Sequence, residues 1–274
     1  MQALRIANEI GDKTKEGAWL GNLGIVYLYL GDYRKTIDHC ELALKIANEI
    51  GDKANEEAWL GNLGHAYRNL GEYNNAIVKY EQALKIATDI GDKPNEGAWL
   101  GSLGSAYCGF FKFKDAIVNY EQALKIATDI GDKANEGAWL GCLGNVYRTY
   151  GDYKKAIDHY EHALKIAKEI GDKANEGLWI GNLGITHGLL GDIKEEIDHY
   201  KWALKIANEI ADNANKGYWL GNLGNAYKDL KDYLKAVDYY EQALEILKST
   251  NGSNHFDTKM FEDKLRIAIE KIKK

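Results

Sequence analysis

The chain has 274 residues, of which 45% are hydrophobic and 28% charged, a balance that excludes both a disordered and a membrane-embedded protein. The formal net charge of −6 disfavours nucleic acid, because a protein that binds it is expected to carry a basic stripe. No apolar run approaches the roughly 18 residues of a membrane span, and no signal peptide follows Met1. We therefore expect no nucleic-acid partner, no membrane partner and a cytoplasmic location.

The first predicted element is residues 1–12. Its Met1-Gln2-Ala3-Leu4 matches Glu81-Gln82-Ala83-Leu84, so the segment is expected to be a partial second helix of an upstream repeat. Two explanations stay open. Either the sequence cuts through a longer array, or this open edge packs on another copy of the chain.

The next 236 residues repeat with a period of 40. Gly-Asp-Lys recurs at this interval from Gly11 to Gly171 and becomes Ala211-Asp212-Asn213 at the sixth place. Six tryptophans keep the same register, and only Trp202 lies outside it. The predicted repeats are 13–52, 53–92, 93–132, 133–172, 173–212 and 213–248, and the tryptophans in phase are Trp19, Trp59, Trp99, Trp139, Trp179 and Trp219.

Each repeat is predicted to hold two helices. In the second repeat Asp52 can cap a first helix over about 54–70, whose apolar residues are three and four apart. Gly71 ends that helix, a second follows over about 73–90, and Gly91 supplies a left-handed cap. Loops of two to four residues require antiparallel neighbours, and only stacked hairpins can bury their apolar faces. The sequence therefore predicts an all-α solenoid of six hairpins.

The last predicted elements are a polar linker over Ser249–Asn254 and an amphipathic helix over Phe256–Lys273, which together form the segment 249–274. The apolar side of this helix holds Phe261, Leu265, Ala268 and Ile272. A helix with a charged outer face suits a C-terminal cap of the array.

The pattern of each repeat resembles the tetratricopeptide repeat (TPR) motif. In the second repeat it reads Leu63-Gly64…Tyr67…Gly71…Tyr73…Ala76…Tyr80…Ala83. Gly-Asn-Leu-Gly at 21–24, 61–64, 181–184 and 221–224 is similar to the 40-residue branch typified by the Leu-Gly-Asn repeat protein and Partner of Inscuteable. The resemblance implies a right-handed superhelix whose first helices line a concave groove that binds extended or helical peptide segments.

Two departures limit the resemblance. The polarity proteins of that branch carry a basic residue just before the tryptophan, whereas this chain has Ala18, Ala58, Ala98, Ala138, Leu178 and Tyr218 there. The G-protein-binding motifs that follow their arrays are also missing from this sequence. Their ligands are therefore not carried over to this chain.

The six repeats differ from one another mainly on one face of the first helix. Ile25, His65, Ser105, Asn145, Ile185 and Asn225 occupy one varying place, and Leu28, Arg68, Cys108, Arg148, Gly188 and Lys228 occupy another three residues on. The same face carries a ladder of asparagines. The predicted peptide-binding residues are Asn22, Asn62, His65, Arg68, Asn69, Ser102, Ser105, Cys142, Asn145, Arg148, Asn182, Asn222, Asn225 and Lys228.

The ladder and its neighbouring glycines each allow two interpretations. An asparagine amide has one acceptor and two donors, so it can bind the backbone of any extended peptide, or it can bond to adjacent repeats as a structural ladder. Gly61 and its equivalents either deepen the groove floor or serve close packing, and Gly64 is expected to face the partner helix. The tryptophans are expected to be core residues.

Signals for chemistry are weak. The sequence has no zinc-protease, nucleophile-elbow, phosphate-loop or dinucleotide motif. His159 and His162 could hold a metal, although their charged helix favours a surface role, and His65 with Arg68 suits a carboxylate ligand. Cys40, Cys108 and Cys142 are an odd number without paired spacing, which favours free thiols. We expect no catalytic residue, metal or cofactor.

The predicted function is therefore a non-catalytic scaffold that binds a protein or peptide partner in its groove. Two alternatives remain. One is a sensor or regulatory array of a larger signalling protein, and the other is self-association through the N-terminal edge.

Overall fold

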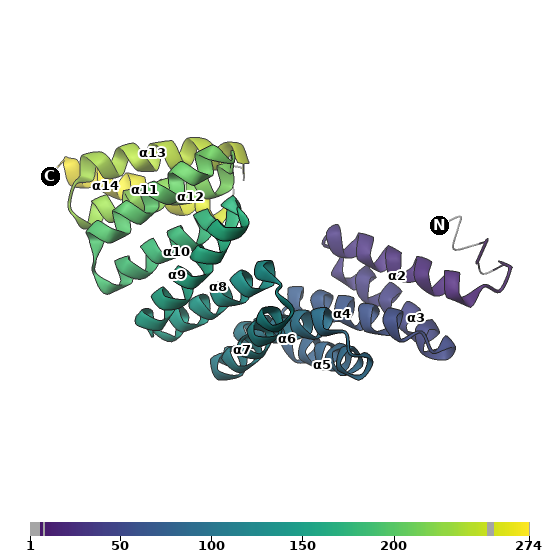
Figure 1. Ribbon diagram of the computed structural model, residues 1–274. Coiled ribbons are helices and arrows are strands. Elements are labelled where there is room, and N and C mark those ends of the chain that lie inside the picture. Colours follow the sequence, from purple (N-terminus) through teal and green to yellow (C-terminus); the bar gives the residue numbers. More distant parts are fainter. Residues whose placement is uncertain (1–5, 8, 251–254, 274) are drawn as a thin grey trace. The chain divides into compact units, whose positions relative to one another are not determined.

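The computed structural model describes residues 6–7, 9–250 and 255–273, and this part of the chain is built from helices and short turns without a strand (Figure 1). The chain divides into two compact units, residues 1–135 and 136–274. The first unit holds α2 (Lys13–Tyr29), α3 (Tyr33–Ile50), α4 (Lys53–Asn69), α5 (Tyr73–Ile90), α6 (Lys93–Gly109) and α7 (Phe113–Ile130).

The second unit continues the pattern. Its helix α8 (Lys133–Tyr150) starts just before the boundary between the units. The remaining helices are α9 (Tyr153–Ile170), α10 (Lys173–Leu190), α11 (Ile193–Glu209), α12 (Asn213–Asp229), α13 (Tyr233–Thr250) and α14 (Phe256–Ile272). Within each unit consecutive helices pack as pairs, which confirms the predicted all-α repeat fold.

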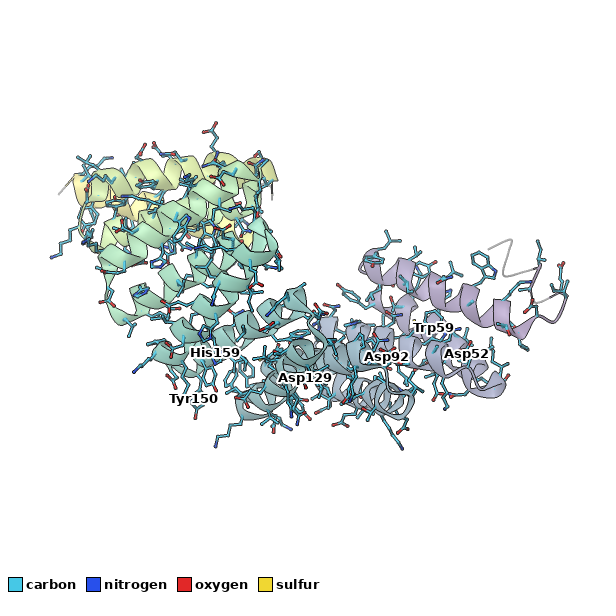
Figure 2. All side chains as sticks on the ribbon, viewed as in Figure 1. Asp52, Trp59, Asp92, Asp129, Tyr150 and His159 are labelled. Atoms are coloured by element: carbon cyan, nitrogen blue, oxygen red, sulfur yellow. The ribbon has the colours of Figure 1, made fainter. Side chains whose placement is uncertain are left out.

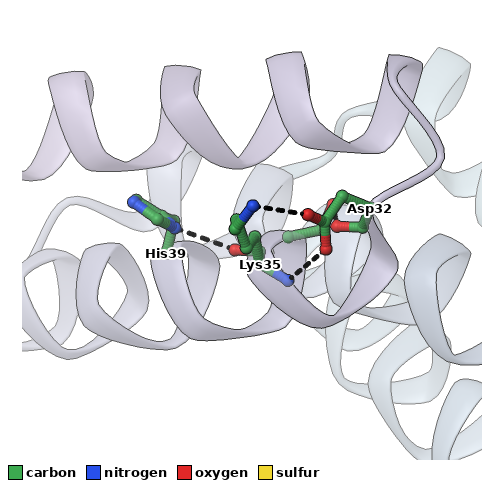
Figure 3. Close-up of polar contacts among 4 residues, drawn as sticks. Asp32, Lys35 and His39 are labelled. Atoms are coloured by element: carbon green, nitrogen blue, oxygen red, sulfur yellow. Dashed lines mark hydrogen bonds and ion pairs between the residues drawn. The ribbon is translucent and has the colours of Figure 1, made fainter.

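Aspartates precede most of the described helices. The side chains of Asp52 and Asp92, at the N-termini of α4 and α6, accept hydrogen bonds from the backbone N–H three residues on (Figure 2). Asp32 does the same before α3, where it accepts from the Lys35 backbone at 3.2 Å and pairs with Lys35 Nζ at 2.8 Å (Figure 3). Such caps contribute about 1 kcal/mol each. The predicted cap at Asp52 is therefore confirmed.

Glycines end most of the second helices. Gly51, Gly91, Gly131 and Gly171 each adopt φ of 73° or 74°, the left-handed region that other residues avoid. Phe111, Ala211 and Lys231 are the non-glycine residues with positive φ in the described chain. The predicted left-handed cap at Gly91 is thus confirmed.

The predicted bounds agree with the structure to within a residue or two for α4, α5 and α14. The linker is the exception, because α13 continues through Ser249 and Thr250, whose hydroxyls bond to the Ile246 carbonyl. Residues 251–254 lie outside the described residues. Of the predicted partial helix 1–12, residues 6, 7 and 9 are helical, and residues 1–5 and 8 lie outside the described part.

Within each unit, successive repeats meet in a joint made of a glycine and a tryptophan. A Cβ on Gly61 would overlap the ring of Trp99, and Gly21 has the same relation to Trp59. In the second unit Gly141 meets Trp179 and Gly181 meets Trp219. The expectation that Gly61 deepens a groove floor is therefore wrong, since the next tryptophan fills the space that the glycine leaves.

The joint also contains the tyrosine of the second helix. A Cβ on Gly64 would lie 2.5 Å from the Tyr80 ring, and that ring stacks on Trp99 with centroids 6.3 Å apart. Trp59, Trp179 and Trp219 are buried, as predicted for core residues. Trp99 and Trp139 are half-buried, and Trp19 departs furthest from the prediction, with 44% of its surface exposed.

Candidate functional site

The predicted binding residues lie on one side of the first helices, here called the first-helix face. Within the first unit α2 contacts α4 and α4 contacts α6, and within the second unit α10 contacts α12. Most of the residues are half-buried. Asn22 and Asn69 are exposed, Asn182 is buried, and the half-buried set is Asn62, His65, Arg68, Ser102, Ser105, Cys142, Asn145, Arg148, Asn222, Asn225 and Lys228.

In the first unit the structure connects His65 to the joint. Its Nδ1 lies 2.7 Å from the hydroxyl of Tyr80, and its ring faces Trp99 with centroids 6.1 Å apart. Burial, helped by the Arg68 charge, lowers the pKa of His65 to about 4, so the ring is neutral at neutral pH. Arg68 reaches across to α6 and donates to Ser105 Oγ at 3.1 Å.

The second unit uses asparagine for the same purpose. The Tyr160 hydroxyl donates to Asn145 Oδ1 at 2.7 Å and accepts from Arg148 Nε at 3.2 Å. Tyr240 donates to Asn225 Oδ1 at 2.9 Å. The varying place at 65, 145 and 225 therefore supplies the hydrogen-bond partner of the joint tyrosine.

In the fifth repeat a different residue bonds to the hydroxyl of the joint tyrosine. Its varying place is Ile185, which cannot form a hydrogen bond, and Tyr200 bonds instead to the carboxyl of Glu196. Gly188 leaves the room for this carboxyl, because a Cβ there would lie 2.6 Å from Glu196 Cδ. Burial raises the pKa of Glu196.

The first repeat has no joint tyrosine and therefore needs no hydrogen-bond partner for one. Cys40 replaces the tyrosine, its Sγ fills the space beside Gly24, and the varying place is the apolar Ile25. Burial raises the pKa of Cys40 to about 12, so the thiol stays protonated. Except in the fifth repeat, where Glu196 bonds to the tyrosine, the polarity at this place thus follows from the residue of the second helix beside it, a role that sequence reasoning missed. The signal was present, because Ile25 and Cys40 depart from the repeat together.

The asparagine ladder is different. Within the described residues the side chains of Asn22, Asn62 and Asn182 have no hydrogen-bond partner, whereas Asn222 Oδ1 accepts from Asn225 at 3.2 Å. The Nδ2 of Asn222 is buried without a partner. The amides therefore do not bond from repeat to repeat, and the donors and acceptors of the exposed Asn22 and the half-buried Asn62 remain available on the first-helix face.

Other candidate sites are less developed. His159 stacks on Tyr147 with centroids 5.2 Å apart, while His162 is exposed. Across the described ranges no three His, Cys, Asp or Glu side chains gather as metal ligands would. None of the helices described is both long and apolar enough to span a bilayer.

Comparison with known families decides the identity of the repeats. The sequence model described as "Tetratricopeptide repeat" matches residues 15–88, 55–129 and 135–209, and a second model of the same description matches 218–257. The chain belongs to the tetratricopeptide repeat family. No curated protein matches it significantly in sequence.

Solved structures share the TPR fold at low identity. BtubC (BKLC) from P. vanneervenii is 21% identical over 80% of this chain and 92% of its own, with a TM-score of 0.71. A STAND protein with a tetratricopeptide repeat sensor from Pyrococcus horikoshii is 20% identical over 97% of this chain and 40% of its own, with a TM-score of 0.79. A Rap protein complexed with Competence and Sporulation Factor is 16% identical over 97% and 79%, with a TM-score of 0.65.

Proposed function

We propose that this TPR chain is a non-catalytic cytoplasmic scaffold whose first-helix face binds an extended segment of a partner protein. The observation that carries the proposal is the set of unpartnered amides on Asn22, Asn62 and Asn182. An amide of this kind can accept from a backbone N–H and donate to a backbone C=O of a bound peptide. It therefore grips a peptide without reading its sequence.

The preference for particular partners then comes from the charged residues beside the ladder. Arg68, Arg148 and Lys228 carry positive charge on the first-helix face. The bonds of Arg68 to Ser105 and of Arg148 to Tyr160 hold the two guanidinium groups in place without neutralising them. The favoured segment is accordingly one with acidic side chains, because arginine pairs with carboxylates in a bidentate manner.

The fold comparisons support this assignment. The Rap protein of similar fold is complexed with Competence and Sporulation Factor, and the STAND protein uses its repeats as a sensor. A sensor array of a larger signalling protein is therefore the closest alternative. We also assign the repeats to the 40-residue branch on the Gly-Asn-Leu-Gly motif and the 40-residue period.

The experiment selects peptides from a random displayed library on the native chain and measures their binding by isothermal titration. Asn22→Ala with Asn62→Ala is expected to weaken binding at least about tenfold, since each lost hydrogen bond contributes about 1 kcal/mol. Unchanged affinity would exclude the ladder as the binding element.

The matched control is Asn74→Ala with Asn75→Ala, which removes two exposed amides from the start of α5. This pair is expected to leave affinity unchanged. Equal losses in both pairs would show that the amides act through general solvation rather than through the first-helix face.

Self-association is a second candidate, favoured by the exposed face of α2. Trp19 and Val26 are 44% and 51% exposed, although their equivalents in α4, Trp59 and Ala66, are buried. A second copy of the chain could cover this face. Cross-linking of the native chain over a concentration series would test it, and a single-chain product throughout would exclude it.

A further inference from the structure

The C-terminal helix α14 occupies a joint that receives a tryptophan in the four other cases described within the units. A Cβ on Gly221 of α12 would overlap the ring of Phe261, just as Gly181 meets Trp219. Phe261 is completely buried and faces Tyr240 at a centroid distance of 6.1 Å. Phe261 thus takes the place of the tryptophan that a further repeat would supply.

Phe261 fits this joint less well than tryptophan fits the others. Its ring is tilted by 36° to Tyr240, whereas the Tyr160–Trp179 and Tyr200–Trp219 pairs are stacked within 23° and 18°. One turn later Lys264 is half-buried beside Lys228, and burial and this like charge lower its pKa. An exposed ion pair, Lys248 with Glu262 at 2.8 Å, links α13 to α14. Such pairs contribute little in water.

The complementary half of the joint lies exposed on α2. Trp19 occupies the place of Trp59 and Trp219, each of which packs on a glycine of the preceding repeat. Val26, two turns further along the same face of α2, is also exposed. The described residues therefore include an exposed tryptophan on α2 and, on α12, a glycine acceptor that is closed by α14.

We propose that Trp19 of one copy docks on Gly221 of a second copy, and that α14 regulates this head-to-tail association by occupying the acceptor with Phe261. The partner is a second copy of this chain, because the four glycine–tryptophan joints described within the units show that the two surfaces fit. This inference rests on the self-association proposed above. It adds Gly221 as the acceptor and α14 as the element that blocks this acceptor.

The test measures the mass of full-length variants by sedimentation equilibrium over a concentration series. The native chain is expected to keep the mass of one chain, 30.7 kDa, at low concentration and to exceed it only at the highest concentrations. Phe261→Asp frees Gly221 and is expected to show a mass that at least doubles as concentration rises. Adding Trp19→Ala to Phe261→Asp is expected to return the mass to one chain.

Gly221→Leu is the matched control, because it displaces Phe261 but fills the acceptor with its own side chain. It is expected to stay at one chain. Mixing Gly221→Leu with the Trp19→Ala, Phe261→Asp chain is expected to give a one-to-one dimer and nothing larger, since only one joint can form.

The outcomes test self-association through α2 separately from the role of Gly221 as the acceptor. Association of Gly221→Leu equal to that of Phe261→Asp would keep self-association but overturn Gly221 as the acceptor. Association that survives Trp19→Ala would overturn Trp19 as the docking residue and, with it, the α2 face as the surface of self-association. Association of the native chain at low concentration would overturn the control by α14.

The milder Phe261→Ala guards against a variant that does not fold, and far-UV circular dichroism checks the helices of each variant. A single-chain mass in both folded variants would overturn the proposal. Loss of the fold in both would also overturn it, because α14 would then be an inseparable part of the core.

Discussion

The joints on the two sides of α4 share the contact between glycine and tryptophan but differ in whether the indole N–H has a hydrogen-bond partner. At the α4–α6 joint Trp99 Nε1 donates to the buried carboxyl of Glu57 at 2.7 Å. At the α2–α4 joint the corresponding residue is Gly17, and Trp59 Nε1 is buried without a partner. A repeat can therefore keep the packing of its tryptophan ring while the hydrogen bond of the indole N–H changes. The contributions of the packing and of the hydrogen bond to stability can be measured separately.

The largest expected effect breaks both joints. Trp59→Ala and Trp99→Ala should each lower the free energy of unfolding by about 3–5 kcal/mol, because each leaves a ring-sized cavity over a glycine. Trp99→Ala should cost more, since it also takes a hydrogen-bond donor from the Glu57 carboxyl. Urea denaturation measures both. Trp202→Ala is the control, because this out-of-phase ring is 42% exposed, and a loss there as large as at Trp59 would contradict the joint as the source of stability.

The next largest effect is a pH dependence of stability, which His65 gives to the α4–α6 joint but not to the α2–α4 joint. Its pKa is about 4 in the folded chain and near 6.5 in the unfolded chain, so the unfolded chain binds the extra proton between these values. Stability should therefore fall as pH drops from about 6.5 to 4, by on the order of 2–3 kcal/mol. The α2–α4 joint has Ile25 and Cys40 in the corresponding places and contributes no such dependence.

His65→Asn is the variant that tests this, because asparagine makes the equivalent bond at Tyr160 and Tyr240. The difference in unfolding free energy between the native chain and His65→Asn should change across this pH range, as followed by denaturation at a series of pH values. A constant difference would contradict the burial of a neutral His65.

A third effect isolates the indole N–H. Trp99→Phe removes the donor to Glu57 and should cost roughly 1–2 kcal/mol more than Trp59→Phe, whose N–H has no partner to lose. Both changes reduce the ring by the same amount, so the difference between them reports the hydrogen bond. Thermal unfolding of the two variants at one pH measures it, and equal losses would mean that Glu57 finds another donor, such as Asn95.

The 40-residue period was sufficient to predict the helices, because caps and apolar stripes are local signals that repetition makes unambiguous. Asp52, Gly91 and the ends of α4 and α5 follow from residues within a few positions. The joint could not be predicted in the same way, since Gly61 meets Trp99 across repeats and nothing local to Gly61 indicates it. Variation at His65 suggested ligand specificity, although its immediate cause is Tyr80, 15 residues away. The asparagine ladder stays a prediction for peptide binding.

The smallest effect would make the first joint resemble the second. Gly17→Glu places a carboxyl where Glu57 stands one repeat later and should offer Trp59 Nε1 an acceptor. Helix propensity contributes roughly 0.7 kcal/mol and the hydrogen bond somewhat more, while burial of the carboxyl and the close Ile46 methyl, 3.0 Å from the new Cβ, oppose them. We expect a net gain of up to about 1 kcal/mol. Gly17→Met is the control, because methionine has a similar helix propensity and side-chain length but no acceptor for the Trp59 N–H. If the free energy of unfolding of Gly17→Glu is no higher than that of Gly17→Met, the unpaired N–H does not destabilise the fold.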